Sequence, residues 1–284
     1  MVGAQRIIAI SSQKGGTGKT TTAINLGAWL ALMEKKVLLV DMDPQADLTR
    51  GLGLCSEEEY DDLAKWLKLG EAKSRPKSEK HSVTMYDVLL NPAAGIQRAT
   101  LSTGIPALSC APSALEFAGA ETELANASDR AWRLSHALSS CTEQYDFIII
   151  DTPPSLGLFT QNAFLACTEL IVPLQVHYFS LRAMRQLLTA LSLMTAYNQS
   201  LHISGIVCTM YDRRNALSRV IEEAVREQFG KLVFDTVIPL NVALAEAPAS
   251  GRPVSLYSPL SRGAQAYYKL AQEMMSRERS TSPA

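Results

Sequence analysis

A glycine-rich loop close to the start of the chain, at residues 13–21, constrains the fold more than any other feature of the sequence. It follows a run of β-branched residues at 6–11 and precedes a helical pattern that extends from residue 19 to about residue 35. Glycines allow the chain to turn sharply, so this order of strand, turn and helix predicts the start of a βαβ unit. Such units build parallel sheets covered by helices.

Further apolar runs predict more strands of the same kind, at residues 37–41, 147–151, 170–172 and 203–209. Their apolar residues are continuous rather than alternating, as in strands that are buried on both faces. Amphipathic patterns predict helices at residues 180–198, 216–229 and 262–279. We therefore predict an α/β fold, a mostly parallel twisted sheet with helices on both faces.

Composition narrows the classes of protein that this chain can be. Its 284 residues carry 27 Lys and Arg against 28 Asp and Glu, a net charge of −1, which excludes a globally basic nucleic-acid binder. The five cysteines include no CxxC pair, and no apolar run reaches the roughly 18 residues of a membrane span. With no signal peptide at its start, the chain reads as a cytoplasmic protein. We expect one domain at 1–279 with a charged surface insert at 57–82, and a disordered tail at 280–284.

The loop at residues 13–21 has the residue types of a phosphate-binding loop. Its backbone N–H groups and the following helix N-terminus favour phosphate, Lys19 would reach the β- and γ-phosphates, and the Thr20 hydroxyl would ligate Mg²⁺. The fold expected is therefore that of a P-loop NTPase. The candidate nucleotide-binding residues are Gly15, Gly16, Thr17, Gly18, Lys19, Thr20 and Thr21.

Carboxylates follow two of the predicted strands, at the edge where α/β sheets bind ligands. Asp41 ends the run at 37–41 and Asp43 follows two residues later; we expect Asp41 near the Mg²⁺ shell and Asp43 farther out, beside an attacking water. Asp151 ends the run at 147–151 in a Walker B-like strand and would hold Mg²⁺ through water. Thr152 stands where many P-loop ATPases place a catalytic Glu, so Asp43 is the candidate for orienting the water.

The loop departs from the ordinary G-x-x-x-x-G-K-[ST] pattern, because an extra lysine, Lys14, precedes its glycines. This KGGTGKT form resembles the deviant Walker A motif of the ParA/MinD ATPases. Other segments are similar to ParA/Soj-type partition ATPases along nearly the whole chain: VLLVDMDPQA (37–46), AGAETEL (118–124), YDFIIIDTPPSLGL (145–158), VIPLNV (237–242) and SRGAQAYYKLA (261–271).

The resemblance implies a set of properties for this chain. It implies an ATP- and Mg²⁺-dependent homodimer in which Lys14 reaches the partner's nucleotide, slow hydrolysis with Asp43 as the water-orienting group, and a ParB-like activator protein. Residues flanking the adenine would be Met210, Pro239 and Asn241. Independently of the resemblance, we expect the turn through Gly157, after the strand that ends at Asp151, to sense the γ-phosphate as a switch.

The same resemblance implies ATP-dependent, non-specific binding of double-stranded DNA, and with it association with the nucleoid. Arg213 matches a DNA-contact position of the family, and Arg214 and Arg219 would extend the patch. Residues Arg182, Arg185 and Lys231 could extend it further. However, Leu240 and Ala243 stand where the family often carries arginine.

Two other functions remain open on the sequence. A MinD-like membrane ATPase needs a C-terminal amphipathic helix with a cationic face, but the pattern at 262–279 ends in mixed charges, so we expect no stable membrane association. A reductase like the nitrogenase iron protein needs cysteines that bridge an iron–sulfur cluster across a dimer, and Cys110 and Cys141 do not have the expected pattern.

Overall fold

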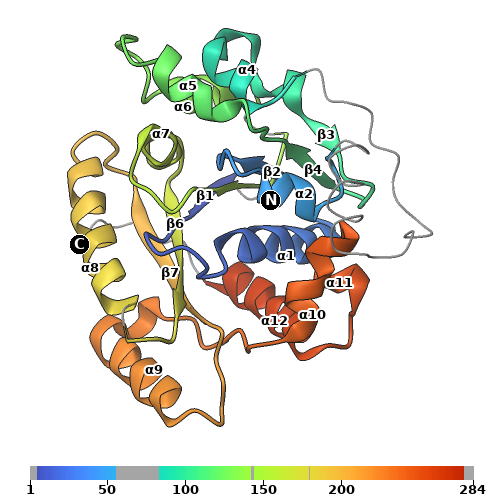
Figure 1. The fold of residues 1–284 in the computed structure, drawn as a ribbon, viewed down its shortest axis with the longest axis vertical. Helices are drawn as coiled ribbons and strands as arrows, with labels where there is room; N and C mark the ends of the chain where they lie inside the picture. Colours follow the sequence, from blue (N-terminus) through green and yellow to red (C-terminus); the bar gives the residue numbers. More distant parts are fainter. Residues whose placement is uncertain (1–4, 56–82, 142–143, 179, 278–284) are drawn as a thin grey trace.

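The computed structural model describes residues 5–55, 83–141, 144–178 and 180–277 (Figure 1). The described residues form a seven-stranded sheet in the order β3-β4-β2-β5-β1-β6-β7. The predicted insert at 57–82 and tail at 280–284 lie outside these residues. The strands are β1 (Arg6–Ile10), β2 (Val37–Asp41), β3 (Leu101–Ser102), β4 (Leu108–Ala111), β5 (Phe147–Asp151), β6 (Glu169–Gln175) and β7 (His202–Thr209).

The sheet is parallel except at one edge, where the short β3 runs antiparallel to β4. The central strands β2 and β5 are buried along their full length, and β1 pairs with β5 on one side and β6 on the other. Helices cover both sides of such strands, which explains their unbroken apolar sequences. The predicted α/β class, with a mostly parallel sheet, is confirmed.

One face of the sheet packs against the first and last long helices, α1 (Lys19–Leu32) and α12 (Arg262–Ser276). The apolar side chains of α12 that are buried there include Tyr267, Leu270, Ala271 and Met274. Three short helices lie beside this pair: α2 (Asp47–Gly51), α10 (Val242–Glu246) and α11 (Val254–Tyr257).

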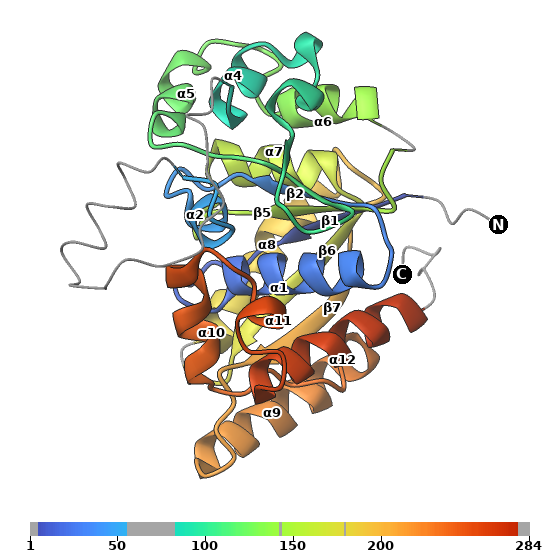
Figure 2. The same ribbon diagram turned by 90° about the vertical axis from the view of Figure 1, so that its right-hand side faces the viewer.

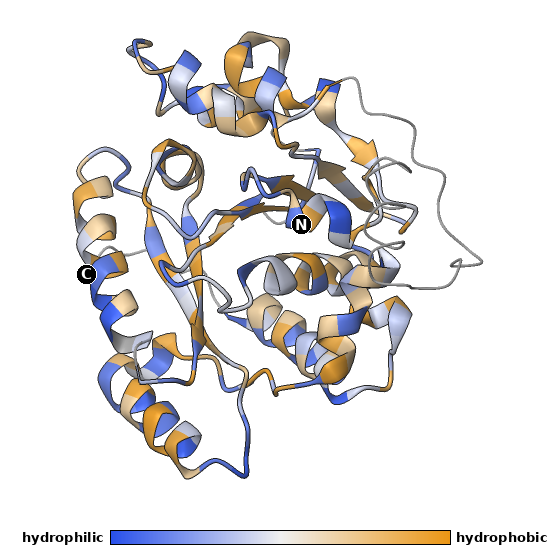
Figure 3. Ribbon diagram, in the orientation of Figure 1, coloured by the Kyte–Doolittle hydropathy of each residue, from blue (hydrophilic) through white to orange (hydrophobic). Residues whose placement is uncertain are grey.

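The opposite face packs against helices from the middle of the chain. They are α4 (Met85–Leu90), α5 (Phe117–Glu123), α6 (Arg133–Leu138), α7 (Leu158–Ala166), α8 (Ser180–Met194) and α9 (Ala216–Phe229). Figure 3 shows mostly apolar strands in the middle and, around them, amphipathic helices with hydrophobic and hydrophilic residues. Short 3-10 turns complete the described structure: η1 (Pro92–Ala94), η2 (Ile96–Ala99), η3 (Ser139–Cys141), η4 (Gly230–Leu232) and η5 (Ala247–Ser250).

The predicted elements are present, with shifted ends. The strand predicted at 170–172 extends over Glu169–Gln175, and the helix predicted at 180–198 ends at Met194. The sequence pattern did not indicate β4, whose residues LSCA include no β-branched side chain, or the short helices α4 to α6.

Different helices lie beyond the two ends of the parallel strands, as Figure 2 shows. The start of α1, together with α2, α5 and α10, lies on one side of the molecule, at the carboxyl ends of the parallel strands. The start of β1 and the end of α12 lie on the other side. Ligands of open α/β sheets bind beyond the carboxyl ends of the strands, so the first side is where a nucleotide site is expected.

A candidate nucleotide-binding site

The glycine-rich loop connects the end of β1 to the first residue of α1, as predicted. Gly16 and Gly18 have φ angles of 71° and 88°, a backbone conformation that side chains with a Cβ rarely adopt. A Cβ built on either glycine would meet no described atom within 4 Å, so this side of the loop borders open space. The loop and the N–H groups of the first turn of α1 therefore form an accessible anion-binding surface.

Lys19 lies in this loop–helix junction with its side chain almost fully buried. Its Nζ donates to the backbone oxygen of Lys14 over 3.4 Å. Burial lowers the pKa of the Lys19 ammonium, while the nearby charges of Asp151 and Asp43 act in the opposite direction. A buried cation with so few partners is well suited to accept a phosphate group.

Thr20 and Asp151 come together although 131 positions separate them in the sequence. The Thr20 hydroxyl donates to Asp151 Oδ2 over 2.7 Å, while Asp151 Oδ1 is buried and has no hydrogen-bond partner among the described residues. Burial, with the neighbouring charge of Asp41, raises the pKa of Asp151 well above its usual range. A divalent cation would balance the buried carboxylate charge and would give the unpartnered oxygen a ligand interaction, so this pair fits Mg²⁺.

The described residues contain no cluster of three or more His, Cys, Asp or Glu side chains that could hold a metal ion. The pair of Thr20 and Asp151 instead matches the usual way in which proteins bind Mg²⁺, with one or two protein ligands and the remaining positions filled by nucleotide phosphates and water. When bound, Mg²⁺ would neutralise charge that develops on the phosphates.

Asp41 and Asp43 have different surroundings. Asp41 is fully buried, and burial raises the pKa of its carboxyl to about 7. Its Oδ1 accepts from the Asp43 N–H at 3.2 Å, and its Oδ2 accepts from the backbone and hydroxyl of Thr49 at 3.0 and 2.6 Å. Asp43 is half-buried and accepts from the Gln45 N–H at 2.9 Å. Asp41 thus faces the protein interior, whereas Asp43 lies close enough to Lys19 to affect the pKa of that lysine.

Thr152 occupies the position that follows the Walker B-like aspartate. It is fully buried, and its hydroxyl donates to the backbone oxygen of Ile10 over 2.9 Å. This side chain therefore ties β5 to β1. The water-orienting role predicted for Asp43 remains a prediction.

Lys14, the additional lysine of the loop, contacts a residue that sequence reasoning missed. Its Nζ donates to Gln175 Oε1 at the end of β6 over 2.8 Å. A second missed residue, Thr209 at the end of β7, donates from its hydroxyl to the backbone oxygen of Thr17 over 2.8 Å. Both are polar residues at the carboxyl end of a parallel strand, and that position was the signal that could have identified them.

The residues predicted near the adenine come together beyond the end of β7. Tyr211 pairs with Pro239 in an isolated bridge, and Met210 beside it has a φ angle of 54°. Asn241 is the residue before α10, and its side-chain Oδ1 is buried with no hydrogen-bond partner among the described residues. An adenine amino group is one donor that this oxygen could accept from. The assignment of these residues to the base remains a prediction.

The arginines predicted to contact DNA lie on one loop and the first turns of α9. Arg213, Arg214 and Arg219 are all exposed. Arg214 forms an ion pair with Asp212 at 3.0 Å. Leu240, which follows Pro239, is also exposed, at 65%. Thus the structure places an apolar side chain at the surface, at a position where the family resemblance implies arginine.

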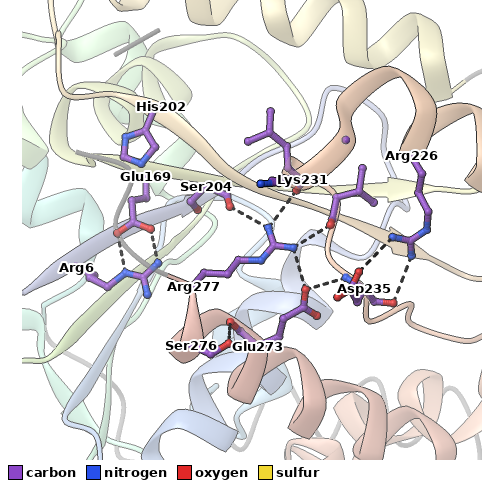
Figure 4. Close-up of a pocket in the computed structure, with 13 residues that line it drawn as sticks. Arg6, Glu169, His202, Ser204, Arg226, Lys231, Asp235, Glu273, Ser276 and Arg277 are labelled. Atoms are coloured by element: carbon purple, nitrogen blue, oxygen red, sulfur yellow. Dashed lines mark hydrogen bonds and ion pairs between the residues drawn. The ribbon is translucent and has the colours of Figure 1, made fainter. Parts of the chain in front are cut away.

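Lys231 does not belong to this group of arginines. It follows α9 and lines a cavity of about 730 Å³ at the amino ends of β1, β6 and β7 (Figure 4). The 14 residues of α9, or roughly 20 Å of helix, separate its position from the loop with Arg213. The basic residues of the segment 182–231 are therefore divided between the carboxyl ends of the strands, near Arg213, and their amino ends, near Lys231.

The cavity in Figure 4 has a charged lining whose members pair with one another. Arg6 forms a buried ion pair with Glu169, and Arg277 binds Glu273 at 2.8 Å. The Arg277 guanidinium also stacks over the Phe234 ring, 3.9 Å from its centroid. These contacts hold the start of β1 and the residue after α12 against neighbouring elements. The cavity lies at the amino ends of the strands, whereas the candidate nucleotide site lies at their carboxyl ends.

A strand, a glycine loop with two lysines, a helix and an aspartate that binds the helix's first threonine define a P-loop nucleotide-binding protein. Residues 5–203 match a family model described as an AAA domain. The chromosome partitioning protein ParA of Caulobacter vibrioides is 42% identical to this chain over 277 residues, which are 96% of this chain and 95% of that protein. The chain belongs to the ParA/Soj family of partition ATPases.

Other comparisons agree with this family assignment. The sporulation initiation inhibitor protein Soj of Bacillus subtilis is 42% identical over 272 residues, 95% of this chain and 98% of that protein. Among solved structures, MinD of Pyrococcus horikoshii complexed with Mg-ADP has a TM-score of 0.73 at 29% identity and covers 96% of both chains. Cobyrinic acid a,c-diamide synthase of Mycobacterium smegmatis with bound ADP and magnesium has a TM-score of 0.71 at 31% identity, over 94% of this chain and 93% of that chain.

Proposed function

We propose that this chain is an ATP-dependent partition ATPase that works as a homodimer on the nucleoid. ATP and Mg²⁺ bind at the loop of residues 13–21, two subunits associate across their nucleotides, and the dimer binds double-stranded DNA without sequence preference. A ParB-like protein on the cargo stimulates a slow hydrolysis that releases the dimer. The cargo is a chromosome, a plasmid or a protein assembly.

The contact between Thr20 and Asp151 carries this proposal. It joins the first turn of α1 to the end of β5 at 2.7 Å and leaves one buried carboxylate oxygen for a cation or its water. Lys14 and Lys19 belong to the same loop, so one nucleotide could engage both a lysine of its own subunit and a lysine of the partner. ATP hydrolysis in a dimer uses these groups for charge stabilisation.

DNA binding in this proposal depends on the arginines near the carboxyl ends of the strands, on the same side as the nucleotide site. Because the net charge is −1, attraction to DNA must come from a local patch, here Arg213, Arg214 and Arg219. Dimerisation doubles the number of phosphate contacts, which would make binding depend on ATP. The chromosome partitioning protein ParA of Caulobacter vibrioides, a relative of similar length, supports the role in partition.

A MinD-like membrane role fits the structure less well. The apolar face of α12 is buried against α1 and the sheet, where it cannot also insert into a bilayer. None of the helices in the described part of the chain is long and apolar enough to cross a membrane. Cys110 and Cys141 are fully buried, which also disfavours a cluster shared between two subunits.

Nucleotide binding is tested with Lys19→Ala in calorimetry with ATP and Mg²⁺. The loss of a charge-assisted phosphate contact should weaken the affinity at least tenfold, equivalent to about 1.5–3 kcal/mol. Lys36→Ala is the matched control, because Lys36 is exposed beyond the other end of α1. Equal ATP affinity in Lys19→Ala and wild type would reject the site.

A further inference from the structure

A chain of hydrogen bonds connects Ser113, two residues after β4, to Asp43 through two buried side chains. The Ser113 N–H donates to Thr49 Oγ1 over 3.0 Å, and Thr49 Oγ1 donates to Asp41 Oδ2 over 2.6 Å. Asp41 Oδ1 then accepts from the Asp43 N–H at 3.2 Å. Thr49 is 3% exposed and Asp41 is 0% exposed, so water does not compete for these bonds.

The direction of the Thr49 hydroxyl proton is fixed by its neighbours. The hydroxyl has one proton, and the Ser113 N–H occupies one of its lone pairs, so the proton points to the acceptor that remains, Asp41. The β-branched side chain of threonine restricts χ1 and holds the hydroxyl in place. The Thr49 N–H donates to the same Asp41 oxygen at 3.0 Å, so one residue fixes the plane of the carboxylate from two sides.

This orientation determines what the other carboxylate oxygen does. With Oδ2 held by Thr49, Oδ1 is turned towards the Asp43 N–H, at the start of the turn in which Asp43 accepts from Gln45. Rotation of the Asp41 carboxylate would remove that anchor from the backbone of Asp43. A general base or water-orienting group must be held within hydrogen-bond reach of its water, so small displacements reduce turnover.

We propose that Thr49 is a positioning residue for ATP hydrolysis, which acts through Asp41 to hold Asp43. The inference rests on the proposed ATPase function and on Asp43 as the water-orienting group. Thr49 does not lie in the phosphate loop, and its effect is on turnover rather than on nucleotide binding. A residue with a purely structural role would instead affect folding, ATP affinity and turnover together.

The test compares Thr49→Val, which keeps the shape but loses the hydroxyl, with Thr49→Ser, which keeps the hydroxyl. Each full-length protein is assayed for steady-state hydrolysis with Mg²⁺ and for ATP affinity by calorimetry. We expect Thr49→Val to lower kcat about tenfold or more with ATP affinity within about twofold of wild type. Thr49→Ser should restore kcat to within about threefold.

Ser113→Ala is the matched control. Its backbone N–H, the group that binds Thr49, is retained, and the Ser113 hydroxyl that it loses has no hydrogen-bond partner among the described residues. Its kcat should therefore equal that of wild type. If Thr49→Val does not fold, Thr49→Ala replaces it, since a smaller side chain creates no steric conflict.

The outcomes separate this inference from the function on which it rests. Wild-type protein without ATPase activity overturns the proposed function itself. An active wild type with unchanged kcat in the hydroxyl-deleted variant overturns the role of Thr49, and so does loss of ATP affinity in parallel with kcat in both Thr49→Val and Thr49→Ala. Failure of Thr49→Ser to recover turnover also overturns it, because the hydroxyl would then not be the group that matters.

Discussion

Lys14 Nζ donates a hydrogen bond to Gln175 Oε1 of its own chain, over 2.8 Å. This contact joins the glycine loop to the end of β6 within one chain. A lysine that acts across a dimer must leave this contact first. Hydrogen bonds to charged groups contribute about 1.5–3 kcal/mol, so the contact with Gln175 opposes dimerisation by a similar amount at most.

Lys14→Ala should bind ATP but fail to form the ATP-dependent dimer. The side chain of Lys14 contacts Gln175 rather than Lys19 or Thr20, so its removal leaves the groups expected to bind phosphate and Mg²⁺ in place. Calorimetry measures ATP affinity, and size-exclusion chromatography with light scattering measures the mass with ATP.

Gln175→Ala serves as the companion variant, because it removes the same hydrogen bond but keeps the lysine. It should still dimerise, at an ATP concentration equal to or below that of wild type. ATP dimers in Lys14→Ala would contradict the cross-dimer role of Lys14.

Asp43→Ala should bind ATP and remain trapped as a dimer. Thr152 is buried and bound to Ile10, so it does not replace a carboxylate near the γ-phosphate. Loss of the water-orienting group should lower turnover by about 100-fold or more. Single-turnover hydrolysis measures this loss, and light scattering measures the persistence of the dimer.

Asp47→Ala is the control for this experiment, since Asp47 is an exposed carboxylate of the same segment. Its turnover should match that of wild type. Normal turnover in Asp43→Ala would reject Asp43 as the water-orienting group and would leave the Thr49 inference without its target.

The parts of the site that could be predicted from sequence are those carried by local pattern. The glycine loop, Lys19 and Thr20 are consecutive, and Asp151 ends an apolar strand, so their roles follow from spacing and from the rule for carboxyl ends of strands. Gln175 and Thr209 could have been noticed from their positions at strand ends, but the residues that they contact lie 161 and 192 positions away, so no local pattern indicates those contacts. Thr49 joins Asp41, eight positions away, to Ser113, 64 positions away, and only the second of these contacts is distant in sequence. Lys231 shows the opposite error: it is close to Arg219 in sequence, but a helix carries it to the other edge of the sheet.

The buried cysteines should make the protein lose stability at alkaline pH. Burial raises the pKa of the Cys167 and Cys208 thiols from 9.0 to about 12. Between these pH values the folded state keeps protons that the unfolded state releases, so the free energy of unfolding falls as pH rises. The slope should be about 1.4 kcal/mol per pH unit for each thiol.

Urea unfolding at pH 8, 9 and 10 measures this slope. Cys208→Ala should be less stable than wild type at pH 8 because of its cavity, but its stability should fall less steeply above pH 9. Parallel curves for the two proteins would contradict the shifted pKa of Cys208. The same burial predicts slow alkylation of both thiols at pH 8, because the thiolate is the reactive form.

Arg213 and Arg214 should bind DNA with unequal strength. Both side chains are exposed, but Arg214 forms an ion pair with Asp212 that it must exchange for a phosphate, whereas no ion pair involves Arg213 in the described part of the chain. Each phosphate contact contributes about 0.9 to the slope of log K against log salt. Replacing both arginines with Ala should weaken binding to any DNA sequence alike and reduce this slope by up to about 2 per monomer, with Arg213→Ala giving the larger share.

A salt titration of duplex binding in the presence of ATP measures these slopes for wild type and the variants. Lys231→Ala is the matched control, because it removes the same charge from the opposite edge of the sheet, where it lines the cavity with Arg277. Its titration curve should coincide with that of wild type.

Equal losses in Lys231→Ala and Arg213→Ala would mean that overall charge rather than this patch attracts DNA. Identical curves for wild type and the double variant would move the DNA site elsewhere on the protein. If wild type does not bind DNA at low salt even with ATP, the exposed Leu240 in place of an arginine marks a surface adapted to something other than the nucleoid.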